Sequence, residues 1–198
     1  MYSLLLNYNK RSKNYLKIFK KNKIYFNYII VCNKKNNLKY PYSKKILTFR
    51  NKKVDFKILR ALNSNKIRKI IISPGDGEII NKNFFKNREI LHCHPGELPF
   101  FKGSGTIYYS MLESKKIYCS IIKLNKRIDE GKVVFKKRFN LPNLKKNSYI
   151  EYDHEIRAKT FVNFLNNRKK LKVKKIKDNY LPYYIPHPII RYLCKNIK

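Results

Sequence analysis

The first half of the chain alternates short apolar runs with segments whose apolar residues recur at helical spacing. This alternation constrains the fold more than any other feature. Four of the five residues at 28–32 are aliphatic or cysteine, as expected of a strand covered on both faces. The rhythm of strand, helix and strand predicts an α/β protein with an open, mostly parallel, Rossmann-like sheet. The expected strands are residues 2–6, 28–32, 70–72 and one beginning at 89–92; the expected helices are 12–20, 54–62 and a short one at 81–85.

The second half predicts fewer and longer elements. A helix is expected at residues 106–112, after a turn containing Gly103 and Gly105, and a long amphipathic helix at 149–165. Strands are expected at residues 117–124 and 132–139, separated by a polar loop. We interpret residues 33–53 as a long polar connection and the proline-rich tail from residue 181 as an irregular cover.

No repeat or linker divides the chain, so the sequence predicts one domain over residues 1–198. Within it, residues 1–90 form the βαβαβ half, 91–140 hold the motifs described below, and 141–198 form the final helix and tail. The four cysteines are scattered, which disfavours a disulfide framework. No apolar run approaches the roughly 18 residues of a membrane helix, and the N-terminus does not resemble a signal peptide. We therefore expect a soluble, cytoplasmic protein without a membrane partner.

The formal net charge of +35 invites a nucleic-acid interpretation, because a basic field attracts phosphates. However, only ten of the 47 basic residues are Arg, and the Lys residues are spread along the chain. Lys, Asn, Ile, Tyr and Phe, all abundant here, have A/T-rich codons, so a biased genome would produce this composition without selection for charge. We expect nonspecific attraction of polyanions at low salt and no dedicated nucleic-acid partner.

The segment from Leu91 to Pro99 carries the strongest chemical signal. If the strand continues to His94, then His92 and His94 lie on one face and Cys93 points the other way. Two imidazoles would then stand at the carboxyl end of a parallel strand, where ligands bind in open α/β sheets. An imidazole can take a proton from an attacking amine or return one to a leaving group.

A second motif is the loop Ile128-Asp129-Glu130-Gly131. The Asp129 carboxylate precedes the last expected strand and could reach back to His94, orienting its ring and stabilising the protonated form. A metal site using His92, His94 and His154 would lack a second close-spaced pair of ligands. No metal is therefore expected.

The order H-x-H-P-G-x-L-P-x-x-K-G followed by I-D-E-G-x-V resembles the catalytic domain of the folate-dependent formyltransferases. The family pattern is N-x-H-P-S-L-L-P, commonly followed by Y-R-G and later by I-D-x-G. Here Phe101-Lys102-Gly103 stands in the Tyr-Arg-Gly place, and the match in both blocks spans residues 90–134. The resemblance is specific to the family and does not identify the substrate.

The resemblance implies that His94 is the catalytic histidine and Asp129 the carboxylate that orients it. The family Asn that binds the developing oxyanion is replaced here by His92, which we expect to act as the donor instead. The resemblance also implies 10-formyltetrahydrofolate as formyl donor. The loops expected to hold its pterin ring contain Pro74, Gly75, Asp76, Gly77, Ile79 and Ile128.

The acceptor that we expect is a primary amine on a small molecule, most plausibly an amino sugar nucleotide. Methionyl-tRNA is an alternative, although enzymes of that type carry a further C-terminal domain for tRNA. Glycinamide ribonucleotide is another, although residues 6–10 lack the Gly-rich phosphate loop of that enzyme. A non-catalytic binding module on a decayed enzyme remains a third alternative, and the sequence leaves open whether the protein forms a homodimer.

Overall fold

The computed structural model describes residues 1–33, 38–50, 55–73, 82–125, 131–144, 148–167 and 180–197. The chain forms two compact units, one of residues 1–92 with 124–126 and one of residues 93–123 with 127–198. Its seven strands follow the order β3-β2-β1-β4-β5-β6-β7. Within the described ranges, no helix has the length and apolar character needed to cross a membrane.

The strands of the first unit are parallel, as the sequence predicts. Their register places apolar residues side by side: Leu5 pairs with Ile30 on one neighbour and with Ile72 on the other. Because both faces are covered, residues on the two sides of β1 are almost fully buried. The strands are β1 (Ser3–Asn7), β2 (Phe26–Cys32), β3 (Ser43–Thr48), β4 (Lys69–Ser73) and β5 (Glu89–His94).

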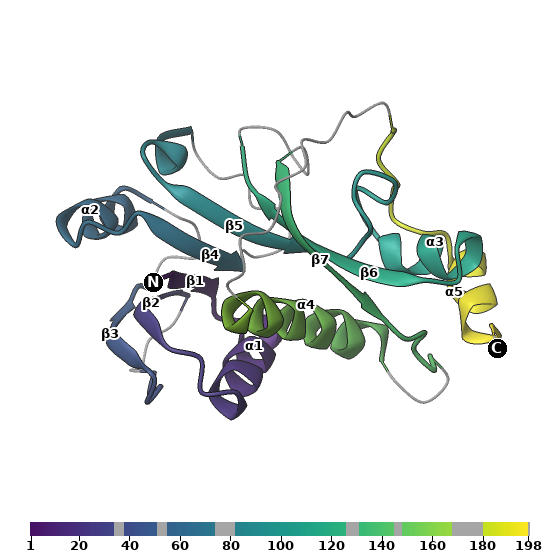
Figure 1. Cartoon of the computed structure of the whole chain (residues 1–198), viewed down its shortest axis with the longest axis horizontal. Coiled ribbons are helices and arrows are strands. Elements are labelled where there is room, and N and C mark those ends of the chain that lie inside the picture. Colours follow the sequence, from purple (N-terminus) through teal and green to yellow (C-terminus); the bar gives the residue numbers. More distant parts are fainter. Residues whose placement is uncertain are drawn as a thin grey trace. The chain divides into compact units, whose positions relative to one another are not determined.

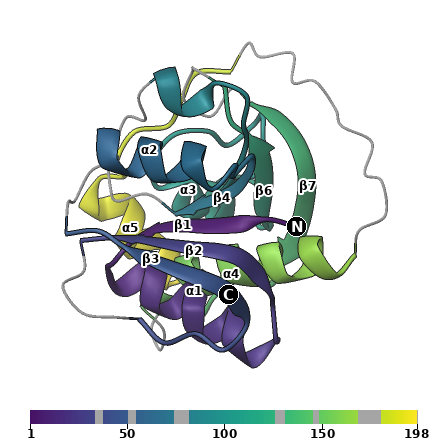
Figure 2. The same cartoon turned by 90° about the vertical axis from the view of Figure 1, so that its left-hand side faces the viewer.

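Two helices cover opposite faces of these strands, as Figure 2 shows. Helix α1 (Lys10–Lys21) begins at a capping box made by Asn9 and Ser12, and its Phe19 packs edge-on against Phe26 of β2. Helix α2 (Phe56–Ser64) begins at Asp55, whose side chain accepts a hydrogen bond from the Ile58 amide. A short 3₁₀ helix, η1 (Lys82–Phe85), adds Phe84 to the core on the side of α2.

The second unit is built on an antiparallel pair of strands. β6 (Ile117–Lys123) and β7 (Lys132–Phe139) pair in a register that shifts between Ile121 and Ile122. Helix α4 (Tyr149–Asn166) lies along this pair (Figure 1). Helices α3 (Thr106–Glu113) and α5 (Pro188–Lys195) pack against each other.

Two sequence interpretations are wrong. The polar segment 33–53 contains strand β3, whose residues are all at least partly exposed and which stands at the end of the strand order beside β2. The tail after residue 181 is not wholly irregular, because α5 forms there with Pro188 in its first turn and His187 as its cap. The remaining elements occur where the sequence predicts them, with bounds that differ by a few residues.

Candidate active site

β5 continues to His94, as predicted, and carries both motif histidines. Cys93, between them, is fully buried, in agreement with its predicted inward direction. His92 is partly exposed, whereas His94 is only 3% exposed. The strand thus ends at a buried imidazole, and β5 is an interior strand of the sheet.

Three hydrogen bonds, two buried and one partly buried, hold carbonyl oxygens at the end of β5 and in the turn that follows it. Such bonds matter because an unpaired buried carbonyl costs about 1–3 kcal/mol. The donors come from three separate helices and strands of the second unit. Arg157 of α4 donates to the Cys93 carbonyl at 2.7 Å, Thr106 of α3 to Pro95 at 2.5 Å, and Ser120 of β6 to Gly96 at 2.6 Å.

His94 itself closes the turn. Its Nε2 lies 2.7 Å from the carbonyl oxygen of Phe101, seven residues later. A carbonyl oxygen can only accept, so Nε2 carries the proton and donates. In the neutral ring Nδ1 is then the basic nitrogen. This assignment decides which atom of His94 can receive a proton without breaking the turn.

Gly96 leaves the space that the His94 ring occupies. A Cβ at residue 96 would lie 2.3 Å from the Phe101 oxygen and 2.8 Å from His94 Nε2. The family pattern has Ser at this place, and a serine has a Cβ. The observed position of the His94 ring therefore depends on Gly96. The sequence comparison with the family pattern shows the substitution but gives no reason for it.

Replacing Gly96 with Ala should therefore destabilise the fold by about 1–3 kcal/mol, because the turn must shift or the His94–Phe101 bond must break. Urea denaturation of the variant and its parent measures this difference. Ser104→Ala, an exposed change in the same segment, serves as the control and should stay within about 0.5 kcal/mol. An unchanged midpoint for Gly96→Ala would show that the turn does not constrain the ring.

A buried ion pair supports the same strand end. Arg157 Nε lies 2.8 Å from Asp153 Oδ1 one turn earlier on α4, and the two side chains are 12% and 7% exposed. A second guanidinium nitrogen, Nη1, donates to the Cys93 carbonyl. Cys119 of β6 lies beside Cys93, and burial raises the pKa of its thiol well above the ordinary value. Both thiols are free and buried, so this side of the strand is a packed, inert wall.

The tail anchors the other end of the turn. Tyr183 forms a parallel bridge with Gly103, whose φ of 93° suits glycine. The Tyr183 ring stacks on Phe101 and Tyr109 with centroids 5.7 and 4.4 Å away. Burial and a hydrogen bond to Glu113 raise its pKa to about 12, so it stays neutral at physiological pH. The segment from 101 to 105 is thereby held on both sides.

Several predicted site residues lie outside the described ranges. They are the oriented carboxylate Asp129 and the expected pterin-loop residues Pro74, Gly75, Asp76, Gly77, Ile79 and Ile128. His154, considered above as a third ligand of a metal site, is a buried residue of α4. Among the described residues, no group of three metal-binding side chains occurs.

Three positioning residues were not predicted as such: Ser120, Thr106 and Arg157. Each acts through a bond to a residue 11 to 64 positions away, so no local pattern marks it. None of the three is among the residues of the two family motifs.

No family model matches this sequence, and no curated protein matches it. Solved structures do match its fold. Methionyl-tRNA formyltransferase from Clostridium thermocellum has a TM-score of 0.61 and 19% identity, with 96% of this chain and 74% of that chain covered. A sugar N-formyltransferase from a Shewanella species has a TM-score of 0.58 and 17% identity, with 92% of this chain and 76% of that chain covered. Phosphoribosylglycinamide formyltransferase from Bacillus halodurans has a TM-score of 0.55 and 12% identity, with 85% of this chain and 97% of that chain covered. The chain therefore has the fold of the formyltransferases, with the predicted catalytic histidine at the end of an interior strand.

Proposed function

We propose that the chain transfers a formyl group from 10-formyltetrahydrofolate to a primary amine. The observation that carries the proposal is the place of His94, at the carboxyl end of an interior parallel strand in a formyltransferase fold. In this reaction the amine loses a proton as its bond to the formyl carbon forms, and the carrier nitrogen gains one as its bond breaks. One group that first accepts and then donates a proton serves both halves.

The hydrogen bond to Phe101 sets a condition on this role. His94 has two ring nitrogens, whereas the proposal gives it three partners: the Phe101 carbonyl, Asp129 and the amine. One partner must therefore be exchanged during the reaction. We propose that substrate binding releases Nε2 from the Phe101 carbonyl and that the ring proton then moves to Nδ1, where Asp129 accepts its hydrogen bond. The unprotonated Nε2 faces the amine and takes its proton, and Asp129 stabilises the imidazolium that forms.

The acceptor class that we propose is an amino sugar nucleotide. Glycinamide ribonucleotide fits less well, because residues 6–10 contain no glycine and so lack a Gly-rich phosphate loop. Incubating the whole protein with 10-formyltetrahydrofolate and a panel of amino sugar nucleotides, with mass spectrometric detection of one added formyl group, tests the proposal. Glycinamide ribonucleotide and methionyl-tRNA belong in the same panel as competing acceptors. If the protein formylates none of the acceptors in the panel, the non-catalytic alternative is the one that remains.

If the positive charge reflects a biased genome rather than selection for nucleic-acid binding, tRNA binding should be weak and steeply dependent on salt. The net charge of +35 should attract any tRNA at low ionic strength, and affinity should fall about a thousandfold between roughly 50 and 200 mM salt. Filter binding with initiator and elongator tRNAs measures this, and the two should bind equally. A preference for methionyl initiator tRNA at physiological salt would favour methionyl-tRNA as the acceptor.

A further inference from the structure

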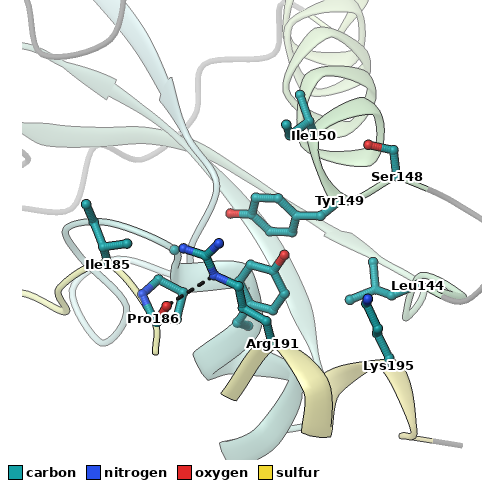
Figure 3. A pocket seen from close by; sticks show the side chains of 10 residues that line it. Leu144, Ser148, Tyr149, Ile150, Ile185, Pro186, Arg191 and Lys195 are labelled. Carbon is teal, nitrogen blue, oxygen red and sulfur yellow. Dashed lines mark hydrogen bonds between the residues drawn. The ribbon is translucent and has the colours of Figure 1, made fainter. Parts of the chain in front are cut away.

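The second unit contains a cavity of about 550 Å³ that none of the motif residues lines. Its wall is formed by the starts of α3 and α4 and by the tail with α5 (Figure 3). This volume lies within the range of roughly 300–1,000 Å³ that is usual for small-molecule sites. The described lining residues are Gly105, Tyr108, Leu144, Ser148, Tyr149, Ile150, Ile185, Pro186, Arg191 and Lys195.

The charged side chains among the described lining residues are all positive. Arg191 and Lys195 stand four residues apart on α5 and so project from the same face of the helix. None of the described lining residues is acidic. The Arg191 Nε donates to the Pro186 carbonyl at 3.1 Å, which fixes the side chain and leaves its terminal nitrogens for another acceptor. Both cations therefore suit an anionic ligand.

The start of α4 reinforces this preference. The backbone amides of its first turn have no partner within the helix, and the Ser148 side chain makes no capping bond. Such a helix start favours an anion, although the first turn of α4 already contains the carboxylate of Glu151, and two cations line the same cavity. The combination is typical of phosphate recognition by arginine, lysine and helix amides.

The rest of the wall is aromatic and aliphatic. Tyr108 and Tyr149 stack with centroids 4.2 Å apart and ring planes 17° from parallel. Tyr108 and Arg191 both line the cavity. Burial raises the pKa of Tyr108, and the positive charge of Arg191 partly offsets this rise. Ile150 and Ile185, 53% and 75% exposed, add apolar area near it. A ligand here meets flat aromatic surface next to positive charge.

We propose that this cavity binds a mononucleotide, with its phosphate at Arg191, Lys195 and the start of α4 and its base against the tyrosine pair. A base stacked on an aromatic side chain gains about 1–3 kcal/mol, whatever the base. The site is separate from His94. It therefore does not depend on the proposed formyl transfer and extends it with a second ligand.

Titration calorimetry of the whole protein with adenosine 5′-monophosphate at physiological salt tests the proposal. Arg191→Gln combined with Lys195→Gln should weaken binding by about ten- to a hundredfold, because two charge-assisted contacts are lost. The matched control is Lys17→Gln with Lys21→Gln, an exposed pair of the same spacing on α1, which should change binding by less than about twofold. Tyr149→Leu should weaken binding of the nucleotide but not of ribose 5-phosphate.

The outcomes separate this site from its rivals. If the substitutions in the α5 pair and in the α1 pair weakened nucleotide binding equally, the binding would be nonspecific attraction and the proposal would be overturned. Ribose 5-phosphate binding as tightly as the nucleotide, or no nucleotide binding at millimolar concentration, would overturn it too. His94→Ala should bind the nucleotide like the parent, and loss there would place the nucleotide at the candidate active site instead. Thermal melting of every variant confirms that each is folded.

Discussion

Replacing His94 with Ala should lower formyl transfer by about 10²–10⁴-fold, the usual range for removing a positioned acid–base group. The ring is buried and bonded to Phe101, so the variant also loses one internal hydrogen bond. That loss leaves the Phe101 carbonyl unpaired and costs about 1–3 kcal/mol of folding stability, which is a separate effect from the loss of transition-state stabilisation. Single-turnover transfer from 10-formyltetrahydrofolate to the acceptor found by the panel, beside thermal melting, separates the two effects.

The matched control is His92→Asn, which restores the family residue two positions earlier on the same strand. If His92 donates to the developing oxyanion, the amide should replace it and activity should be retained or raised. Loss of activity in His92→Asn would instead assign His92 a role of its own. Turnover at the parent rate in a folded His94→Ala would remove His94 from the catalytic assignment.

Much of the fold could be predicted from sequence because its strands are strongly marked. Buried parallel strands have apolar residues on both faces, so β2 and β4 stand out as short uninterrupted runs. β3 was missed for the opposite reason. It is the end strand of the order, its two lysines are exposed, and its sequence does not differ from a polar connection.

Helix α5 shows a different limit. Its apolar residues are largely solvent-exposed, with Ile189 and Tyr192 61% and 67% exposed, and three prolines precede or begin it. A proline-rich segment without a buried stripe suggests an irregular tail. Pro188 at the start of the helix was the available signal, because proline is favoured in the first turn.

The sequence predicts a chemistry for the candidate site but not the residues that support His94. The spacing of His92 and His94 locates them on one strand end, and the structure confirms that strand. The bond from His94 to Phe101 and the space left by Gly96 depend on the path of the turn, which no pattern specifies. The role of Asp129 stays a prediction, since it lies outside the described residues.

Arg157 is the supporting residue whose removal should cost the most stability. Arg157→Met keeps the length of the side chain but leaves the Asp153 carboxylate buried without its partner and takes a donor from the Cys93 carbonyl. Breaking a buried pair from one side costs about 3–5 kcal/mol. Urea denaturation should therefore show a large loss of stability relative to the parent.

Two comparisons give this prediction its test. Lys159→Met breaks the Lys159–Glu155 pair, which has the same spacing on the same helix but is about half exposed, and should cost less than about 1 kcal/mol. Adding Asp153→Leu to Arg157→Met removes the unpaired charge, so the double variant should recover at least about 1 kcal/mol of the loss. If Arg157→Met were no more destabilising than Lys159→Met, the pair would not hold the strand end at His94. If instead the double variant were the less stable one, the cost would come from packing, because removing the uncompensated carboxylate would then have brought no gain.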